Sequence, residues 1–180
     1  MRIYYDSEFL EDGRTIELIS IGLVAEDGRE YYAVNWDMPW RRIVRHEWLR
    51  ANVVPSLPVV RHDGIRPLRK PFLDRAHPDV KRRARIADEV RDFLQATPDV
   101  ELWASYGAYD HVVLCQLWGA MVDLPDGVPM FTRDLQQEAA RLGNPPLPEQ
   151  AGGFHNALAD ARHVKTVAEF LTVMPTGKKE

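Results

Sequence analysis

The 180-residue sequence predicts a mixed α/β fold in which helices cover a sheet. The first observation is that three strand-like segments, rich in β-branched and aromatic residues, follow one another within the first 35 residues. The second is that the later strand-like segments alternate with segments of helical periodicity. The third is the composition, with 45% hydrophobic and 28% charged residues, which is ordinary for one globular domain with a full-sized core.

The first three strands are predicted at residues 1–9, 15–25 and 30–34. The sequence Glu-Asp-Gly-Arg occurs twice, at 11–14 and at 26–29, once in each gap between the strands. Asp-Gly between apolar runs is a strong hairpin signal, because glycine accepts the positive φ angles of a tight turn. We therefore expect an antiparallel three-stranded meander.

The remaining elements are predicted from periodicity and from the residues that break it. Helices are expected at 40–51, 79–96, 109–118, 133–142 and 156–171, and two further strands at 100–105 and 128–131. The stretch 53–78 is expected to be irregular, because it contains five prolines. The sequence thus predicts a single domain over residues 1–174, followed by a flexible tail at 175–180.

Composition disfavours several classes of protein. No apolar run is long enough to cross a bilayer, and the first residues lack the apolar segment of a signal peptide, so we expect a cytoplasmic protein. Cys115 is the only cysteine, which excludes an internal disulfide and a cysteine-based zinc site, and its apolar neighbours favour an inert buried thiol. None of the four serines lies in a Gly-x-Ser-x-Gly motif, which disfavours a serine hydrolase.

The net charge of −4 argues against a protein that coats nucleic acid through broad electrostatic attraction. It does not argue against an enzyme that holds a short strand end through metal ions. The charge is also uneven, because residues 61–85 contain nine basic and three acidic residues. This basic segment could hold an incoming nucleic-acid backbone, or it could be a solvated face without a partner.

Asp6 and Glu8 close the first predicted strand. Because side chains alternate along a strand, both carboxylates project from the same face, where like charges raise each other's pKa. A divalent cation with oxygen ligands is the natural partner for such a pair. A solvated strand end is the alternative.

Asp110 begins a predicted helix, and its spacing to Val113, Leu114 and Leu117 puts it on the apolar stripe of that helix. It also follows the strand predicted at 100–105, and the carboxyl ends of strands are where α/β sheets tend to bind ligands. The alternative is an aspartate that only faces the positive end of the helix dipole.

Asp160 lies on the apolar stripe of the last predicted helix, beside Val164 and Val167. An ionised carboxylate that faces a core is costly unless it is paired or bound to a metal. A salt bridge, to His163 for example, is the alternative explanation.

His155 precedes Asp160 by five residues and follows two consecutive glycines, Gly152 and Gly153. The glycines indicate a mobile segment that leads into the helix. A histidine there could move over the site and act as a general base, or it could simply stand at a helix start without a role.

Read together, these residues resemble the DEDDh exonucleases, a superfamily with a ribonuclease-H-like fold. Its first motif, Asp-x-Glu, matches Asp6 and Glu8, and its second, an aspartate at a helix start after a central strand, matches Asp110. Its third motif, His-x4-Asp, matches His155 and Asp160. The order and separations fit over nearly the whole domain, and in detail the chain is most similar to small actinobacterial 3′-5′ exoribonucleases of the polyadenylate-specific type.

Two positions depart from the common pattern of that superfamily. Phe9 follows the first-motif glutamate where many members have threonine, and the second motif reads Tyr-Gly-Ala-Tyr-Asp at 106–110 where many read Asn-x-x-Phe-Asp. The version in this chain, Tyr-Gly-Ala-Tyr-Asp, is more similar to the branches that act on RNA tails and structured RNA. These departures bear on substrate preference rather than on the chemistry.

The resemblance implies a mixed five-stranded sheet flanked by helices, and two Mg²⁺ or Mn²⁺ ions about 4 Å apart. Asp6, Glu8, Asp110 and Asp160 would hold these ions. One ion would activate a water for attack on the terminal phosphodiester of single-stranded RNA or of a 3′ overhang, with His155 as the general base. The other would stabilise the leaving 3′ oxygen, and the product would be a nucleoside 5′-monophosphate.

Substrate contacts are expected from residues beside these motifs and from the basic segment. Phe9 could stack on the terminal base, a contact worth about 1–3 kcal/mol in single-strand binders, or it could belong to the core. The further candidates are Ser7, Tyr109, Arg61 and Arg66. The five tryptophans, Trp48 among them, are expected to have core or interface roles.

Two other functions remain open from the sequence. A 3′-5′ DNA exonuclease would share the same site, because only contacts with the 2′-hydroxyl separate RNA from DNA. A non-catalytic RNA-binding protein of the same fold is disfavoured by the complete set of acidic motifs. A homodimer or higher homo-oligomer is expected from the resemblance alone.

Overall fold

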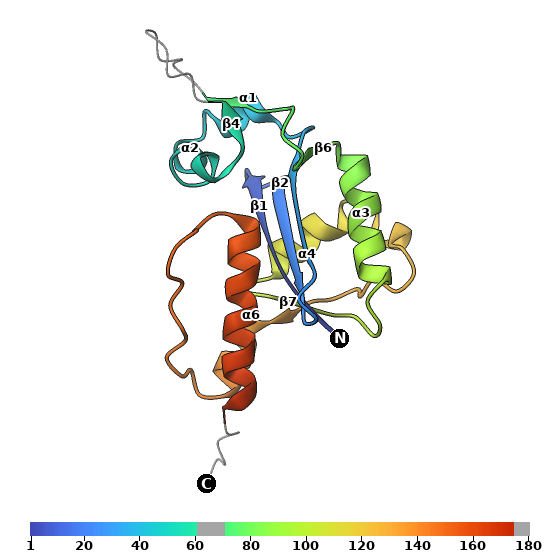
Figure 1. Ribbon diagram of the computed structural model, residues 1–180, viewed down its shortest axis with the longest axis vertical. Coiled ribbons are helices and arrows are strands. Elements are labelled where there is room, and N and C mark those ends of the chain that lie inside the picture. The colour runs from blue at the N-terminus through green and yellow to red at the C-terminus, as the bar shows by residue number, and fades with distance from the viewer. Residues whose placement is uncertain (61–70, 175–180) are drawn as a thin grey trace.

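The computed structural model describes residues 1–60 and 71–174, whose course is drawn in Figure 1. The tail at 175–180, together with Arg61 and Arg66 of the basic segment, lies outside the described residues. The strands are β1 (Arg2–Glu11), β2 (Ile16–Ala25), β3 (Glu30–Asn35), β4 (Val59–Val60), β5 (Phe72–Leu73), β6 (Val80–Lys81), β7 (Glu101–Ala104) and β8 (Arg133–Asp134). The helices are α1 (Trp40–Ile43), α2 (Glu47–Asn52), α3 (Arg83–Gln95), α4 (Ala108–Cys115), α5 (Leu135–Arg141) and α6 (Ala157–Val173), with 3-10 turns η1 (Val54–Ser56) and η2 (Met121–Asp123).

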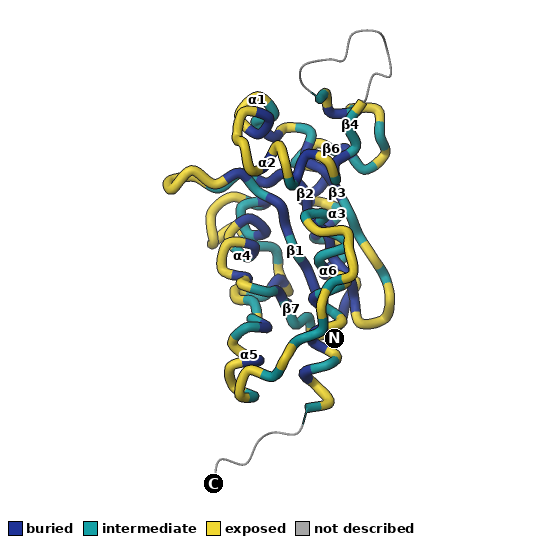
Figure 2. The backbone as a smooth tube through the Cα atoms, turned by 90° about the vertical axis from the view of Figure 1, so that its left-hand side faces the viewer, coloured by how far each residue is buried: buried dark blue, intermediate teal, exposed yellow. Residues whose placement is uncertain are grey.

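A mixed six-stranded sheet with the order β6-β3-β2-β1-β7-β8 forms the centre of the molecule. β1, β2 and β3 pair antiparallel, which confirms the predicted meander. β6 pairs parallel with β3, β7 with β1, and β8 with β7. The long strand β1 is therefore interior in the sheet, and Figure 2 shows it buried along most of its length.

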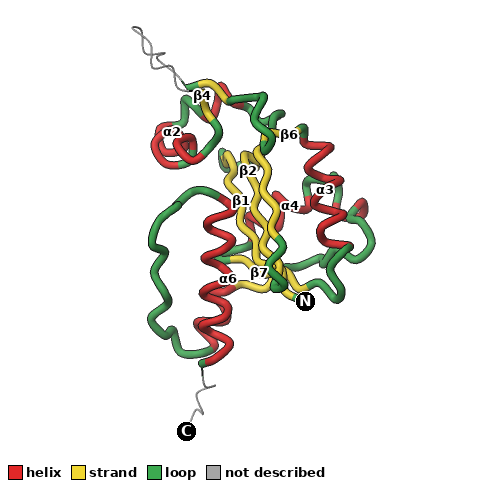
Figure 3. Tube along the Cα trace, in the orientation of Figure 1, coloured by secondary structure: helices red, strands yellow, loops and turns green. Residues whose placement is uncertain are grey.

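Helices cover both faces of this sheet, as Figures 1 and 3 show. Alternate residues of β1 face opposite layers, because the side chains of a strand alternate. Ile3 and Tyr5 pack in the core beneath α3 and α4, and Tyr4 packs in the core formed with α5 and α6. Leu10, at the far end of β1, joins a third apolar cluster with α1 and α2, which therefore close that end of the sheet.

Two predictions about the strands were wrong: the number of strands in the sheet, and the position of the last strand. The sheet has six strands where five were expected, because Val80 and Lys81 pair with β3 instead of beginning a helix. The segment 128–131 is not a strand, since Pro129 supplies no N–H for a ladder. The edge strand lies just beyond it, where Arg133 and Asp134 pair with β7.

The predicted helix 40–51 is two helices, and the helix predicted from residue 79 begins at Arg83. The His46 side chain interrupts the first of these by accepting a hydrogen bond from the Leu49 N–H, so that it caps α2. The other helices lie within three residues of their predicted ends. None of the described helices has the length and apolar composition that a bilayer crossing needs.

Candidate active site

Three of the predicted carboxylates converge beside the second half of β1, which continues past them to Glu11, so Asp6 and Glu8 do not close the strand as predicted. Asp6 and Glu8 come from that strand, and Asp160 comes from the first turn of α6. Each offers one oxygen, and these three oxygens lie within 4.8 Å of one another. Strand alternation explains the first pair, and the packing of α6 on the sheet brings the third.

The approach of α6 depends on Gly22, which is the partner of Asp6 in the ladder between β1 and β2. A Cβ atom built on Gly22 would lie 2.4 Å from the Ala157 carbonyl oxygen and 2.5 Å from the Leu158 Cα. Only glycine therefore lets the first turn of α6 rest on the sheet at this point. That contact places Asp160 beside Asp6.

Asp110 belongs to the same pocket, but its carboxylate is already engaged by the protein. Its Oδ1 accepts hydrogen bonds from the Ser7 N–H at 2.8 Å and from the Ser7 hydroxyl at 2.6 Å. Because Ser7 lies between Asp6 and Glu8, this contact fixes the start of α4 to the strand that carries the other carboxylates. Ser7, predicted as a substrate contact, is buried, and its hydroxyl donates its hydrogen bond to Asp110.

Burial raises the pKa of all four carboxylates. The pKa of Asp6 is raised well above its ordinary value by burial and by the charges of Asp110, Glu8 and Asp160. That of Glu8 is raised to about 8 by burial and by the same neighbours Asp160 and Asp110, and that of Asp110 to about 6 by burial. Burial also raises the pKa of Asp160, although a hydrogen bond from the Gln150 amide to Asp160 Oδ1, at 2.6 Å, acts to lower it.

No lysine or arginine among residues 1–60 and 71–174 forms an ion pair with any of these carboxylates. His163, the alternative partner of Asp160, forms none with it in the same part of the chain. In this described part, the basic group that pairs with one of these carboxylates is the imidazole of His155, whose Nδ1 lies 3.9 Å from Glu8 Oε1. Buried carboxylates that repel one another are neutralised either by binding protons, which their raised pKa values favour, or by a bound cation. This electrostatic deficit fits a divalent metal with oxygen ligands.

An open pocket of about 380 Å³ contains all five residues of the predicted machinery, together with Ser7, Phe9 and Tyr109. The Phe9 and Tyr109 rings are stacked, with centroids 5.9 Å apart and an angle of 13° between their planes. Tyr109 also lines a neighbouring pocket of about 320 Å³, formed with the β1–β2 hairpin. Tyr109 is exposed and Phe9 is half-buried, so an aromatic surface separates the two pockets.

Trp48 lies in the pocket and not in the core, which was one of the two roles expected for it, the other being an interface. It is 49% exposed. Its ring stands edge-on to that of His155, with centroids 4.9 Å apart and an interplanar angle of 79°. The burial of its neighbour Leu49 on α2 could have indicated that Trp48 faces the other way. Ser105 and Tyr106 also line the pocket and had not been singled out.

His155 is held in a strained backbone conformation at the mouth of this pocket. Its φ angle is +61°, in the left-handed region, where a residue with a Cβ costs about 1–3 kcal/mol. Asn156 follows it and caps α6, since its side chain accepts a hydrogen bond from the Ala159 N–H. The side chain of His155 is partly exposed, so its ring can be reached from solvent.

Comparison with known proteins gives two relatives that align over almost their whole length. No protein-family model matches the chain. Two proteins of Mycobacterium tuberculosis, one from strain CDC 1551 / Oshkosh and one from strain ATCC 25618 / H37Rv, are each named a 3′-5′ exoribonuclease. Each is 46% identical to this chain over 164 residues, which cover 90% of the chain and 88% of the relative.

Proposed function

This chain belongs to the family of 3′-5′ exoribonucleases that the two mycobacterial proteins represent, and from that premise we propose that it removes nucleoside 5′-monophosphates from 3′ ends of single-stranded RNA. It is an exonuclease by this membership. The proposal extends to the DEDDh class, with Asp6, Glu8, Asp110 and Asp160 as metal ligands. The observation that carries it is the convergence of Asp6, Glu8 and Asp160 in a pocket that, among residues 1–60 and 71–174, no lysine or arginine lines.

The donor set fits Mg²⁺ or Mn²⁺ better than a softer metal. All the candidate ligands are carboxylate oxygens, and the lone Cys115 lies outside the pocket. Two such ions, when bound, would polarise the scissile phosphate and lower the pKa of a water. Asp6, Glu8 and Asp160 would together neutralise the charge of the two ions. Asp110 would reach the site from the helix that Ser7 anchors.

His155 is the group we assign to proton transfer. Its imidazole stands at the mouth of the pocket, with Nδ1 3.9 Å from Glu8 Oε1 and access to solvent. From there it can take the proton of an attacking water and pass it to bulk solvent, while Glu8 stabilises the imidazolium that results.

We propose that the aromatic residues of the pocket bind the 3′ end of the RNA. The terminal base would stack on Phe9 or Trp48 inside the pocket, and the base before it would pass over Tyr109 into the neighbouring pocket. Stacking is tolerant of sequence because every base has an aromatic face. We assign Ser7 to holding Asp110 rather than to contacting RNA, because both its N–H and its hydroxyl donate to that carboxylate.

Digestion of matched RNA and DNA oligonucleotides with a 3′ tail tests the function. With Mg²⁺ or Mn²⁺ the RNA should shorten from its 3′ end and release 5′-monophosphates, identified by mass, and excess EDTA should stop the reaction. Asp160→Asn should abolish it, whereas the matched change Asp88→Asn, at an exposed ion pair on α3, should not. Release of 3′-phosphates, or activity that survives EDTA, would contradict the proposal, and faster digestion of DNA would favour the DNA exonuclease.

A further inference from the structure

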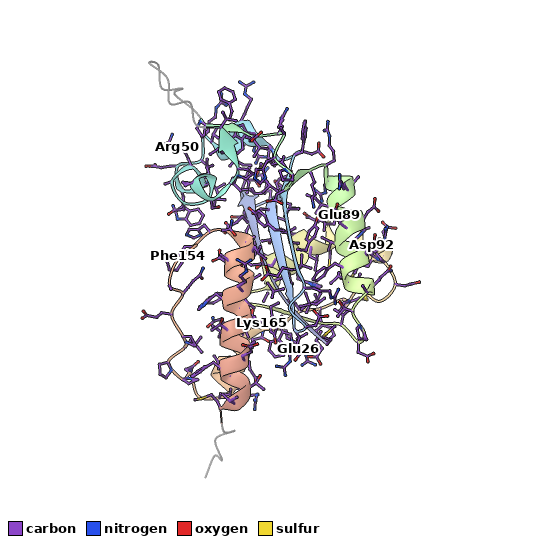
Figure 4. All side chains as sticks on the ribbon, viewed as in Figure 1. Glu26, Arg50, Glu89, Asp92, Phe154 and Lys165 are labelled. Atoms are coloured by element: carbon purple, nitrogen blue, oxygen red, sulfur yellow. The ribbon has the colours of Figure 1, made fainter. Side chains whose placement is uncertain are left out.

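We propose that Ser56 and Trp48, from the segment α2–η1, are positioning residues that hold His155 over the carboxylates. This inference rests on the proposed function, because it gives His155 the role of general base. It concerns residues that no sequence motif includes and that come from a segment other than β1, α4 and α6. Figure 4 shows the segment's surroundings: the loop that ends at Phe154 lies beneath the helix α2, which carries Arg50.

The need for such a device follows from the backbone around His155. The chain between α5 and α6 has no helix or strand from Leu142 to Asn156, so no backbone ladder fixes this loop. Gly153 has a φ of +76° and His155 a φ of +61°. Glycine adopts this region freely, but histidine does so only where its surroundings hold it there. Strain of this kind gathers at functional sites because it fixes a side chain that must not turn away.

Ser56 supplies the contact that holds the backbone. Its hydroxyl lies 2.5 Å from the His155 carbonyl oxygen and 2.8 Å from that of Val53. One hydroxyl has a single proton to donate, and of its two acceptors only the His155 carbonyl lies on the loop before α6. A bond to the carbonyl of the strained residue opposes rotation about the bonds on either side of it. Without this bond, that carbonyl would lose the donor that Ser56 supplies within the described part of the chain.

Trp48 supplies the contact that holds the ring. Its indole stands edge-on to the imidazole, with centroids 4.9 Å apart, an arrangement that aromatic pairs prefer and that stabilises the observed orientation of the His155 ring. The next residue, Asn156, is fixed by capping α6 and by donating to the Tyr32 hydroxyl at 3.5 Å. His155 is therefore anchored at its carbonyl, at its ring and at the residue that follows it.

The segment itself is rigid enough to act as a support. Leu49, Val53 and Val54 are buried in the apolar cluster that closes the end of the sheet. Ser56 and Trp48 thus project from an element whose other face is core, whereas His155 projects from a loop. Side chains are positioned more precisely by packed helices and strands than by loops. The contacts with α2–η1 therefore position His155 more precisely than its own loop could.

A pair of variants of equal shape isolates the hydroxyl of Ser56. Ser56→Thr keeps a hydroxyl, and Ser56→Val has the same branching without one. Single-turnover digestion of a 3′-tailed RNA should show the valine variant with kcat about three- to tenfold below the threonine variant, the scale of one hydrogen bond. KM and the Mn²⁺ concentration for half-maximal rate should match in the two. Thr166→Ala, which removes a hydroxyl-to-carbonyl bond within α6 away from the pocket, is the control and should not change kcat.

Amide ¹⁵N relaxation gives a second readout, independent of activity. The amides of Phe154 and His155 should gain fast motion in Ser56→Val and in Trp48→Ala, and not in Ser56→Thr. Equal kcat and equal relaxation in the Ser56→Thr and Ser56→Val variants would overturn the inference. His155→Ala separates this failure from that of the proposed function: if it retains full activity the general base is wrong, whereas if it is inactive only the role of Ser56 is refuted.

Discussion

Glu8 and Glu89 are two glutamates of one protein, both partly withdrawn from water, in opposite surroundings. Glu89 on α3 accepts from Lys81 at 2.7 Å, from Arg85 at 2.8 Å and from the Tyr31 hydroxyl at 3.0 Å, and its position is labelled in Figure 4. Partial burial acts to raise its pKa, but these donors bring the pKa below its ordinary value. The pKa of Glu8 is instead raised to about 8, by burial and then by Asp160 and Asp110.

The difference separates a carboxylate that supports the fold from one that is kept for a ligand. Where a glutamate joins α3 to the sheet, the chain supplies cations for it, and the interaction is complete within the protein. Around Asp6 and Glu8 the described chain supplies no lysine or arginine ion pair, and we expect a bound metal to offset the cost of burying the charges. The carboxylates of the candidate site are therefore expected to favour activity at the expense of stability.

Neutralising one carboxylate in each region should separate the two roles most clearly. Asp6→Asn should lower exonuclease activity about a thousandfold or more, since metal catalysis contributes several kcal/mol. Without metal it should melt no lower than the wild type, because a repelling charge is gone. Glu89→Gln should keep its activity and lose about 1 kcal/mol, which lowers Tm by about 2–4 °C. Reversed effects in the two variants would contradict the assignment of roles.

Gly22 tests whether the geometry of the site depends on backbone contact. Gly22→Ala adds a Cβ against the first turn of α6, an overpacking that should cost about 1–3 kcal/mol and move Asp160 away from Asp6. Thermal melts should show the loss of stability, and Mn²⁺ titration of the activity should show weaker metal binding. An alanine variant with the wild-type Tm and metal dependence would show that α6 need not touch the sheet here.

Stability without metal should fall as the pH rises, and the raised pKa values give the sign. Glu8 has an ordinary pKa of 4.5 and a folded pKa of about 8, so the folded protein binds this proton more tightly. Its contribution to stability is present below about pH 4.5 and lost as the pH rises to about 8. In EDTA, the Tm measured at a series of pH values across this window should therefore fall less steeply for Glu8→Gln than for the wild type. Equal slopes would show that Glu8 has no raised pKa.

Much of the fold could be read from the sequence because its signals are local. The Asp-Gly turns set the meander, and the stripe around Asp160 set the face of α6. The short strands were missed for the opposite reason: Val80–Lys81 and Arg133–Asp134 have two residues each and form only because a neighbouring strand is there to pair with. Pattern cannot find an element that only tertiary context creates.

The candidate site divides in the same way. The carboxylates were found because charged residues on apolar faces stand out in a sequence. Trp48 and Ser56 were not, since neither breaks a local pattern, and their contacts with His155 join positions 107 and 99 residues apart in the chain. The role of Gly22 was likewise hidden, because a glycine in a strand does not say which helix rests on it.

Calorimetric titration of the metal-free protein with Mn²⁺, near pH 8, tests most directly whether these carboxylates form a metal site. Wild-type protein should bind the ion saturably and gain Tm, and Glu89→Gln should do the same. Asp6→Asn should lose both the heat of binding and the gain in Tm. Binding of equal affinity in Asp6→Asn and the wild type, or none in either, would contradict a metal site formed by Asp6, Glu8 and Asp160.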